Sequence, residues 1–156
     1  MERWKSGAFA RAGAVYSFLM LSLNRFRPWF YAAALYNAAW GLAVMAMPNL
    51  LFDLLNMPRP NYPELFQCIG MIVGVYAIGY WLVARDPARY GAFVYIGLLG
   101  KTLGPIGFLF GALQHRLPWQ FGWINVFNDL IWLPAFAAFV IVFTKCEHAA
   151  KAERAV

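Results

Sequence analysis

The chain has 156 residues, of which 62% are hydrophobic and only 13% are charged, and its formal net charge is +6. A soluble globular domain carries about 25% charged residues, so this composition excludes an ordinary soluble protein and indicates one integral membrane domain. No basic run of five or more residues lies outside the apolar segments, which argues against a nucleic-acid partner.

Residues 1–28 start with basic residues and contain the apolar stretch Ala12 to Leu23, an arrangement similar to that of a signal peptide. No cleavage site of small residues follows this stretch, and a fifth span here would place basic residues on the wrong side of the membrane. We therefore expect a cytoplasmic-side interfacial arm, helical and broken by Pro28, that docks on lipid or on a partner protein.

Four continuous apolar segments follow the arm. Each has about 20 residues or more, the length that a helix needs to cross a hydrocarbon core of about 30 Å. The predicted fold class is all-α, an integral membrane four-helix bundle of residues 29–144 with an N-terminal interfacial helix and a cytoplasmic tail of residues 145–156. The predicted spans are Trp29 to Leu51, Leu65 to Ala84, Tyr90 to Leu113 and Trp119 to Thr144.

The basic residues between these spans predict their orientation. One side of the membrane would carry ten Lys and Arg residues and the other side only Arg59 and Arg116, and cytoplasmic loops collect positive charge. Both termini are therefore expected in the cytoplasm, as in a multi-pass protein of the bacterial inner membrane, with the lipid bilayer as its first partner. Tyr80 and Trp81 would lie at the cytoplasmic headgroup level, where aromatic residues are common.

Lys101 is the only lysine, and Asp129 the only acid, inside the four spans. A charged side chain at the centre of a bilayer costs about 2.5 to 3.5 kcal/mol on insertion scales, so such residues normally pair or face a polar cavity. Lys101 lies 12 residues from Leu113, and Asp129 lies 10 residues from Trp119. At 1.5 Å per residue these depths are about 18 and 15 Å, which predicts an ion pair between the third and fourth spans.

A polar stripe accompanies the acid in the fourth span. Residues spaced i, i+3, i+4 and i+7 share one face of a helix, and a polar face inside a membrane must meet protein or a cavity. The members of the stripe are Asn125, Asn128, Asp129 and Trp132. In the first span, Asn37 and Trp40 share a face by the same spacing.

Two prolines lie beside these charges. A proline cannot donate to the carbonyl four residues before it, so Pro105 frees the carbonyl of Lys101, and Pro134 frees that of Leu130, next to Asp129. We expect a helix kink at each proline. Freed carbonyls inside a membrane need protein, hydroxyl groups or water as new partners.

Two interpretations of this polar centre stay open. It is either a small hydrated pocket for a ligand or an ion, or a salt bridge that only fixes the register of the helices. Trp40 and Trp132 would pack either against a ligand or against each other. The candidate residues of the ion-pair or ligand-binding centre are Lys101, Asp129, Asn128, Asn125, Thr102, Asn37, Trp40 and Trp132.

Glycines recur at spacings of three and four residues in the second and third spans. Membrane helices associate through small residues that let their backbones approach closely, so these glycines are predicted to form the helix contacts. They are Gly70, Gly74, Gly97, Gly100, Gly104, Gly107 and Gly111.

Motifs for catalysis or for a cofactor are missing from the sequence. Its two cysteines, Cys68 and Cys146, form no Cys-x-x-Cys pair, and His115 and His148 lie outside the spans. The chain has no cluster with metal-ligand spacing, no phosphate-binding loop and no nucleophile motif. We therefore expect no metal, no cofactor and no catalytic residues, and an enzyme is the less favoured class.

Several motifs carry a resemblance to a known group of proteins. Residues 97–108, GLLGKTLGPIGF, and residues 128–134, NDLIWLP, resemble a family of small four-span bacterial membrane proteins, as do residues 35–41, LYNAAWG, and 57–62, MPRPNY. The resemblance covers residues 30–140. It implies the four-span topology and the importance of Lys101 and Asp129, and it implies no reaction. The likeness to four-span bundles of the DoxX type is only architectural.

Three classes of function follow from these observations. The first is a non-enzymatic protein that acts by binding, either as an accessory subunit of a larger energy-transducing complex or as the holder of a lipid-like or quinone-like ligand. The second is a small proton-coupled carrier that uses Asp129 and Lys101 and requires a homo-oligomer. The third is a membrane enzyme on an apolar substrate, with Lys101 as the base. A protein partner or a second copy of the chain is expected in the first two classes.

Overall fold

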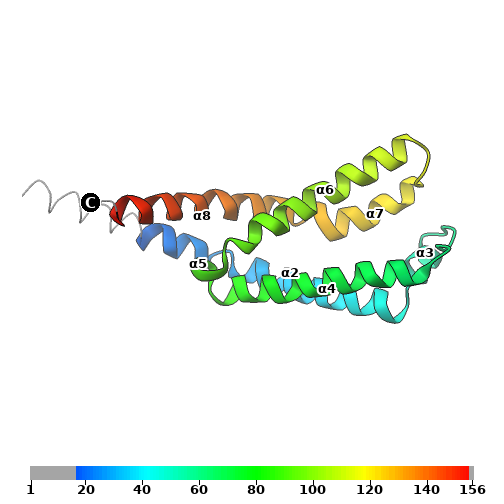
Figure 1. Cartoon of the computed structure of the whole chain (residues 1–156), viewed down its shortest axis with the longest axis horizontal. Coiled ribbons are helices and arrows are strands. Elements are labelled where there is room, and N and C mark those ends of the chain that lie inside the picture. Colours follow the sequence, from blue (N-terminus) through cyan, green and yellow to red (C-terminus); the bar gives the residue numbers. More distant parts are fainter. Residues whose placement is uncertain (1–16, 155–156) are drawn as a thin grey trace, which may run out of the picture.

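The computed structural model describes residues 17–154, and every regular element in this part of the chain is a helix (Figure 1). The predicted all-α class is therefore confirmed for the described residues. In chain order the elements are α2 (Arg27–Ala46), α3 (Leu50–Leu54), α4 (Pro63–Arg85), α5 (Pro87–Tyr90), α6 (Phe93–Leu113), η1 (Trp119–Phe121), α7 (Gly122–Asn125), η2 (Val126–Leu130) and α8 (Leu133–Arg154).

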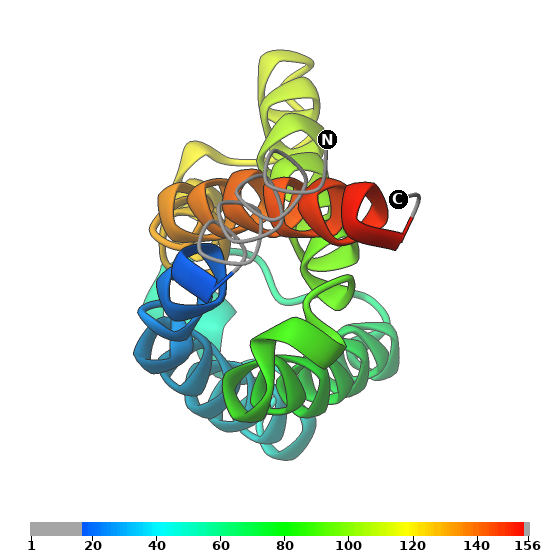
Figure 2. The same cartoon turned by 90° about the vertical axis from the view of Figure 1, so that its left-hand side faces the viewer.

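The long helices form two hairpins. One consists of α2 and α4, and the other of α6 and the segment that runs from α7 into α8 (Figure 1). The hairpins lie close together near α5, and they diverge towards the opposite end, where α3 and the turn between α6 and α7 are far apart. The end-on view shows the same divergence, because α6 rises away from the α2–α4 hairpin (Figure 2).

Three helical stretches of the described chain are long and apolar enough to cross a membrane: Pro63–Arg85, Phe93–Leu113 and Trp119–Ala152. They correspond to the second, third and fourth predicted spans. The helix of the first predicted span, α2, has 20 residues and falls outside this set. The described residues thus have the helices of a multi-pass membrane protein.

The first helix ends earlier than predicted. Met47 leaves the helical conformation, with φ of −137° and ψ of 68°, because Pro48 follows it and a proline disfavours helical geometry in the preceding residue. The short helix α3 then forms separately. The predicted end of this segment at Leu51 is therefore wrong.

The N-terminal arm also differs from its prediction. Residues 17–24 are helical, and a turn at Arg25 and Phe26 separates them from α2. Pro28 does not break a helix, because it lies in the first turn of α2, where its missing N–H group has no helical partner to lose. Leu23 is only 1% exposed and belongs to the protein's own core, so this end of the arm docks on the chain's own helices. Residues 1–16 of the predicted arm lie outside the described part.

Close backbone contact joins α2 to α4. A Cβ atom on Gly41 would lie 2.7 Å from the carbonyl oxygen of Gly70 and 2.9 Å from the Cα of Gly74. Side chains separate most helix pairs by 8 to 10 Å between axes, and only residues without a Cβ allow a closer approach. Gly70 and Gly74 therefore lie at a helix contact, with Gly41 opposite them.

The core of the molecule is aromatic and lies where the two hairpins meet. Phe30 of α2 and Tyr80 of α4 both contact Phe136 of α8, with ring centroids 5.1 and 5.0 Å apart. Phe139 lies one turn further along and packs edge-on against Phe30 at 4.8 Å. Tyr80 is 1% exposed, so its predicted place at the membrane surface is wrong, whereas Trp81 is exposed.

The last segment is longer and less regular than predicted. The π-helical turn η2 interrupts it in the middle, and α8 then continues to Arg154 instead of ending at Thr144. Residues of the predicted cytoplasmic tail are helical up to that point. Cys146, in this extension, is buried in the aromatic core.

The glycines of α6 do not all serve the predicted contacts. Added Cβ atoms on Gly97, Gly104 and Gly111 would lie within 3 Å of Tyr80, Asp129 and Leu117 respectively, so these three positions are closely packed. Cβ atoms on Gly100 and Gly107 would meet nothing within 4 Å. The prediction of a helix contact is therefore wrong for these two glycines. The row of glycines along α6 is closely packed only where a side chain from another part of the fold reaches the α6 backbone.

Candidate functional site

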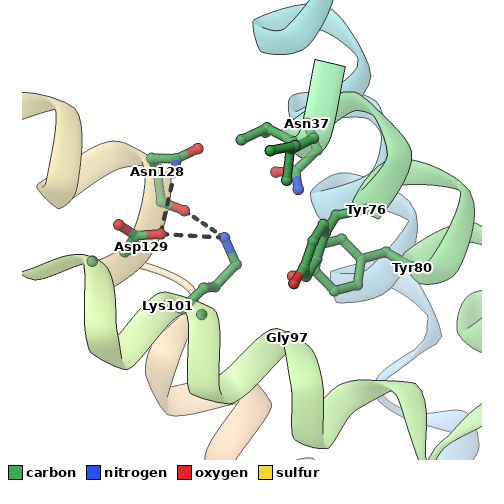
Figure 3. A pocket seen from close by; sticks show the side chains of 11 residues that line it. Asn37, Tyr76, Tyr80, Gly97, Lys101, Asn128 and Asp129 are labelled. Carbon is green, nitrogen blue, oxygen red and sulfur yellow. Dashed lines mark hydrogen bonds and ion pairs between the residues drawn. The ribbon is translucent and has the colours of Figure 1, made fainter. Parts of the chain in front are cut away.

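Lys101 of α6 and Asp129 of η2 meet in the interior, between the two hairpins. The Lys101 Nζ atom lies 3.8 Å from Oδ1 of Asp129, and the residues are 4% and 8% exposed. Nζ also donates a hydrogen bond to the backbone carbonyl of Asn128 (Figure 3). The sequence places these charges at a similar depth, and the structure brings them together on facing helices.

The π-helical turn η2 supplies the carbonyl that Lys101 uses. The N–H of Ile131 bonds to the carbonyl of Val126, five residues earlier, and the N–H of Trp132 bonds to Asp129, three residues earlier. The carbonyls of Phe127 and Asn128 therefore do not receive their usual helical partners.

Side-chain N–H groups donate hydrogen bonds to both of these carbonyls. Nζ of Lys101 donates to Asn128, and Nε1 of Trp132 donates to Phe127 at 3.0 Å. Pro134, which has no N–H, lies in the first turn of α8 just after this irregular stretch. Pro105, the site of the other predicted kink, lies inside α6, which continues as one helix on both sides of it.

Aromatic rings surround the ammonium group of Lys101. Nζ lies 5.8 Å from the ring centroids of Tyr80 and Phe136, and 6.0 Å from that of Trp132. A cation within about 6 Å of a ring face is attracted by the ring's quadrupole, and the attraction strengthens when water is excluded. The rings and the carboxylate together offset the cost of burying this charge.

A cavity of about 240 Å³ lies between the two hairpins, beside this pair. All four long helical segments contribute to its wall. Gly97, Gly100 and Gly104 of α6 have no side chains to fill it. The polar groups around it are Asn37 of α2, Tyr76 and Tyr80 of α4, Lys101 of α6, and Asn128 and Asp129 of η2 (Figure 3).

Two asparagines in the cavity wall have an amide oxygen that accepts no hydrogen bond from the described part of the chain. Asn37 is 3% exposed, yet no donor among the described residues reaches its Oδ1 atom. The Oδ1 atom of Asn128 is in the same state, although its Nδ2 donates to Asp129 at 3.3 Å. Most buried polar groups in proteins have a partner, and one left without it costs about 1 to 3 kcal/mol. Asn37 and Asn128 are therefore the polar groups in the wall that remain to be satisfied.

Other predicted members of the centre lie elsewhere. Thr102 donates to the carbonyl of Leu98 in its own helix, and it does not line the cavity. Asn125 lines an apolar pocket near Trp119 and Trp123 rather than the cavity, but its amide oxygen lies beside the Asp129 carboxylate, since a Cβ on Gly104 would be 3.6 Å from the one and 2.6 Å from the other.

The two tryptophans expected to pack together are also apart. Trp40 contacts Phe66 at 6.1 Å, and Trp132 contacts Tyr36 at 5.5 Å. Trp40 thus belongs to a separate small cluster near α3. Only Trp132 is close to Lys101.

The site predicted from the sequence does not include the residues that form one wall of the cavity. This wall is formed by Ile72, Val73, Tyr76 and Tyr80 of α4. These positions share one helix face by their i, i+1, i+4 and i+8 spacing, which is a signal in the sequence. Because that face also contains ordinary apolar residues, spacing alone does not separate a cavity wall from a packed core.

A second ion pair lies outside the spans, at the diverging end of the molecule. Arg59 donates to both carboxylate oxygens of Asp53, at 2.7 and 2.8 Å. The hydrogen bond from Arg59 lowers the pKa of the Asp53 carboxyl, and the same contact raises the pKa of the guanidinium group. The pair ties the loop after α3 back to that helix.

A scan against protein-family models, a search of curated proteins and a search of solved structures find no match for this chain. The resemblance to a family of four-span proteins therefore rests on its motifs alone. A function has to be inferred from the geometry of the cavity.

Proposed function

We propose that this chain is a non-enzymatic, multi-pass membrane protein that binds the polar head of a lipid-like small molecule between its two hairpins. The observation that supports the proposal is the cavity beside a buried ion pair, with the unpartnered amide of Asn37 in its wall. A salt bridge that only fixed helix register would need neither the cavity nor the amide.

The proposal includes four membrane crossings with both termini in the cytoplasm. The 20 residues of α2 extend about 30 Å at 1.5 Å per residue, the thickness of a hydrocarbon core. This helix also lies antiparallel to α4, which is long and apolar enough to span. The distribution of basic residues supports the orientation.

The size of the cavity favours a ligand of which only the head enters. Pockets that enclose a whole drug-sized molecule have about 300 to 1,000 Å³, and this one has about 240 Å³. Ile72, at its edge, is 59% exposed. A hydrocarbon tail that left the cavity there would pass between the diverging hairpins into the lipid.

The charges in the wall favour a head without net charge. Lys101 and Asp129 neutralise each other, so an anionic head would add a charge next to the carboxylate, and a cationic head would add one next to the ammonium. Burying an ion without a partner costs several kcal/mol. An uncharged polar head adds no such cost.

Two glycines of α6 provide a matched test of binding. Gly100 lines the cavity, and a Cβ atom there would meet no other atom within 4 Å. Gly100→Leu should therefore fill the cavity without displacing the protein. Gly107 is equally open but lies away from the cavity, so Gly107→Leu controls for the effect of a larger residue on helix α6.

The measurement is equilibrium binding to the purified full chain in lipid nanodiscs. The probes are decyl-chain amphiphiles with alcohol, methyl ether, carboxylate, ammonium, quinone and hydroquinone heads. We expect saturable one-to-one binding of an uncharged probe, weakened at least tenfold by Gly100→Leu and unchanged by Gly107→Leu. If no probe binds, or if both variants bind like the wild type, the proposed function is wrong.

A further inference from the structure

We propose that the cavity selects a head group that bears an uncharged hydroxyl, an alcohol or a phenol, over heads that only accept hydrogen bonds. The inference rests on the proposed function and names its ligand class. For a ligand that cycles between a quinone and a hydroquinone, it assigns the reduced, hydroxyl-bearing form to this site.

The wall of the cavity has more acceptor capacity than its own donors use. The Oδ1 atoms of Asn37 and Asn128 accept no hydrogen bond from the described residues. The carboxylate of Asp129 accepts from Asn128 Nδ2 at 3.3 Å and lies 3.8 Å from the ammonium group. A carboxylate has about four acceptor positions, so Asp129 keeps positions free for a ligand that donates.

Lys101 supplies the complementary donor. Its ammonium group has three protons; one goes to the carbonyl of Asn128, and another points towards Asp129. The third remains for a ligand oxygen. In the close-up view, Nζ and the amide of Asn37 face each other from opposite sides of the cavity (Figure 3).

A hydroxyl group fits between these two walls because it accepts and donates at the same oxygen. It can accept from Lys101 and donate to an amide or carboxylate oxygen. The amide of Asn37 can turn about its last torsion, since such torsions have two broad, nearly equivalent minima. A ketone, a quinone or an ether can only accept, so it can bond to Lys101 but brings no donor to the carboxylate of Asp129.

The tyrosine rings in the cavity wall can accommodate a hydroxyl carried either by a phenol or by an aliphatic chain. Tyr76 and Tyr80 have ring centroids 6.1 Å apart in an edge-on arrangement, and both line the cavity. A phenol ring can extend this edge-to-face packing, whereas an aliphatic alcohol would place methylene groups against the same rings. The chemistry that we assign is the hydroxyl, and the probes distinguish the two frameworks.

The test compares matched probes on the wild-type chain in nanodiscs. Decanol is paired with decyl methyl ether, and decylhydroquinone with decylquinone. We expect at least one hydroxyl-bearing probe to bind at least tenfold more tightly than its partner. Tighter binding of decylhydroquinone than of decanol would identify a phenol as the source, and the reverse would identify an aliphatic alcohol.

Asn37→Leu, which removes the amide at similar volume, should reduce the preference for the hydroxyl at least threefold. Asn61→Leu, at an exposed loop position, should leave it unchanged. The probe series on the wild type decides the inference even if Asn37→Leu does not fold.

The outcomes separate this inference from the proposed function. Equal binding of hydroxyl and acceptor-only probes, abolished by Gly100→Leu, would overturn the preference for a hydroxyl and leave a ligand-binding cavity. Tighter binding of the quinone or the ether would overturn it in the same way. The absence of any binding would overturn both proposals.

Discussion

Lys101 introduces a positive charge into an apolar interior, and the atoms around its ammonium group offset the cost of burial. Asp129 supplies the countercharge at 3.8 Å, and the turn in η2 supplies a carbonyl from Asn128. Three aromatic rings complete the surroundings. The partners come from α4 and from the segment that runs from η2 into α8, so the buried charge depends on how both pack against α6.

Removing one member of the ion pair should destabilise the fold more than removing both. Lys101→Met would leave the Asp129 carboxylate buried without a countercharge, and such a loss typically costs about 3 to 5 kcal/mol. Replacing both partners with apolar residues of similar volume is often neutral. We therefore expect Lys101→Met to lower stability markedly and Lys101→Met/Asp129→Leu to restore most of it.

Thermal or denaturant unfolding in one detergent would measure this double-mutant cycle. Equal losses for the single and double variants would contradict a coupled pair. The double variant should still lose binding of uncharged probes, because the proposed site uses the ammonium group as its donor.

The exposed pair Asp53–Arg59 should give a pH effect confined to low pH. The folded pKa of Asp53 is lowered by the hydrogen bond from Arg59. Its contribution to stability is therefore present above the usual aspartate pKa of about 3.9, and it is lost as the pH falls through the lowered folded pKa. Both side chains are largely exposed, so the effect on stability will be small.

Carbon NMR of a labelled Asp53 carboxyl would follow this titration directly. Arg59→Met should return the pKa of Asp53 towards its usual value. Arg116→Met, in the loop between α6 and η1, should not change it. An Asp53 carboxyl that titrates alike with and without Arg59 would show that the pair does not form in solution.

At the scale of the helices, glycine determines how closely α2 and α4 approach. The backbones meet at Gly41, Gly70 and Gly74, but these positions are not equivalent. The missing side chain of Gly41 points into α4, whereas a Cβ on Gly74 would meet nothing within 4 Å. The cost of a methyl group should therefore differ sharply between them.

Gly41→Ala should destabilise the α2–α4 hairpin, and Gly74→Ala should be tolerated. The first variant forces a methyl group against backbone atoms that cannot rotate away, and overpacking of this kind costs about 1 to 3 kcal/mol. The second gains helix propensity, about 0.8 to 1 kcal/mol in an exposed helix. Unfolding midpoints measured for the two variants under identical conditions would check the order, and a less stable Gly74→Ala would reverse our assignment.

The sequence is a good guide to some helix ends and a poor guide to others. The end of α6 at Leu113 follows from the loss of apolar residues, and α4 differs from its prediction by one or two residues. The early end of α2 before Pro48 follows from a rule about the residue preceding proline, but the apolar run continues past it and hides the break.

The candidate site was only partly predictable, for reasons of geometry. A depth count along two helices places Lys101 opposite Asp129. The periodicity of a regular helix cannot anticipate the π-helical turn η2, which changes the direction of every later side chain in that segment. Asn128 and Asp129 line the cavity, whereas Asn125, one turn earlier, lines a different pocket although its amide oxygen lies near Gly104 together with the Asp129 carboxylate.

At the scale of the whole molecule, the two hairpins share one aromatic core and diverge beyond it (Figure 1). The ion pair and the cavity lie between the hairpins, next to the Tyr80 and Phe136 rings of that core. The closed end, with Phe30, Phe136 and Phe139, fixes the hairpins to each other, and the open end leaves apolar faces that suit lipid. A ligand that enters from the membrane would thus reach the cavity without unpacking the core.

This arrangement depends on α2 crossing the membrane, which is testable by the parity of the crossings. With four crossings, Asn24 before α2 and Asn61 after α3 lie on opposite sides of the membrane. If only the three most apolar stretches crossed, both residues would lie on the same side. Single cysteines at Asn24, Asn61 and Ala88, all exposed positions, in a chain with Cys68 and Cys146 replaced by Ala, would distinguish the two cases.

A membrane-impermeant maleimide applied to intact spheroplasts should label Asn61→Cys and should reach Asn24→Cys and Ala88→Cys only after permeabilisation. Ala88 follows α4 and lies on the side opposite Asn61 whether or not α2 crosses, so it serves as the control for the crossing of α4. Labelling of both Asn24→Cys and Asn61→Cys from outside would remove α2 from the spans. The helix that carries Asn37 would then not lie within the bilayer opposite Lys101, and the ligand-binding proposal would fail with the topology.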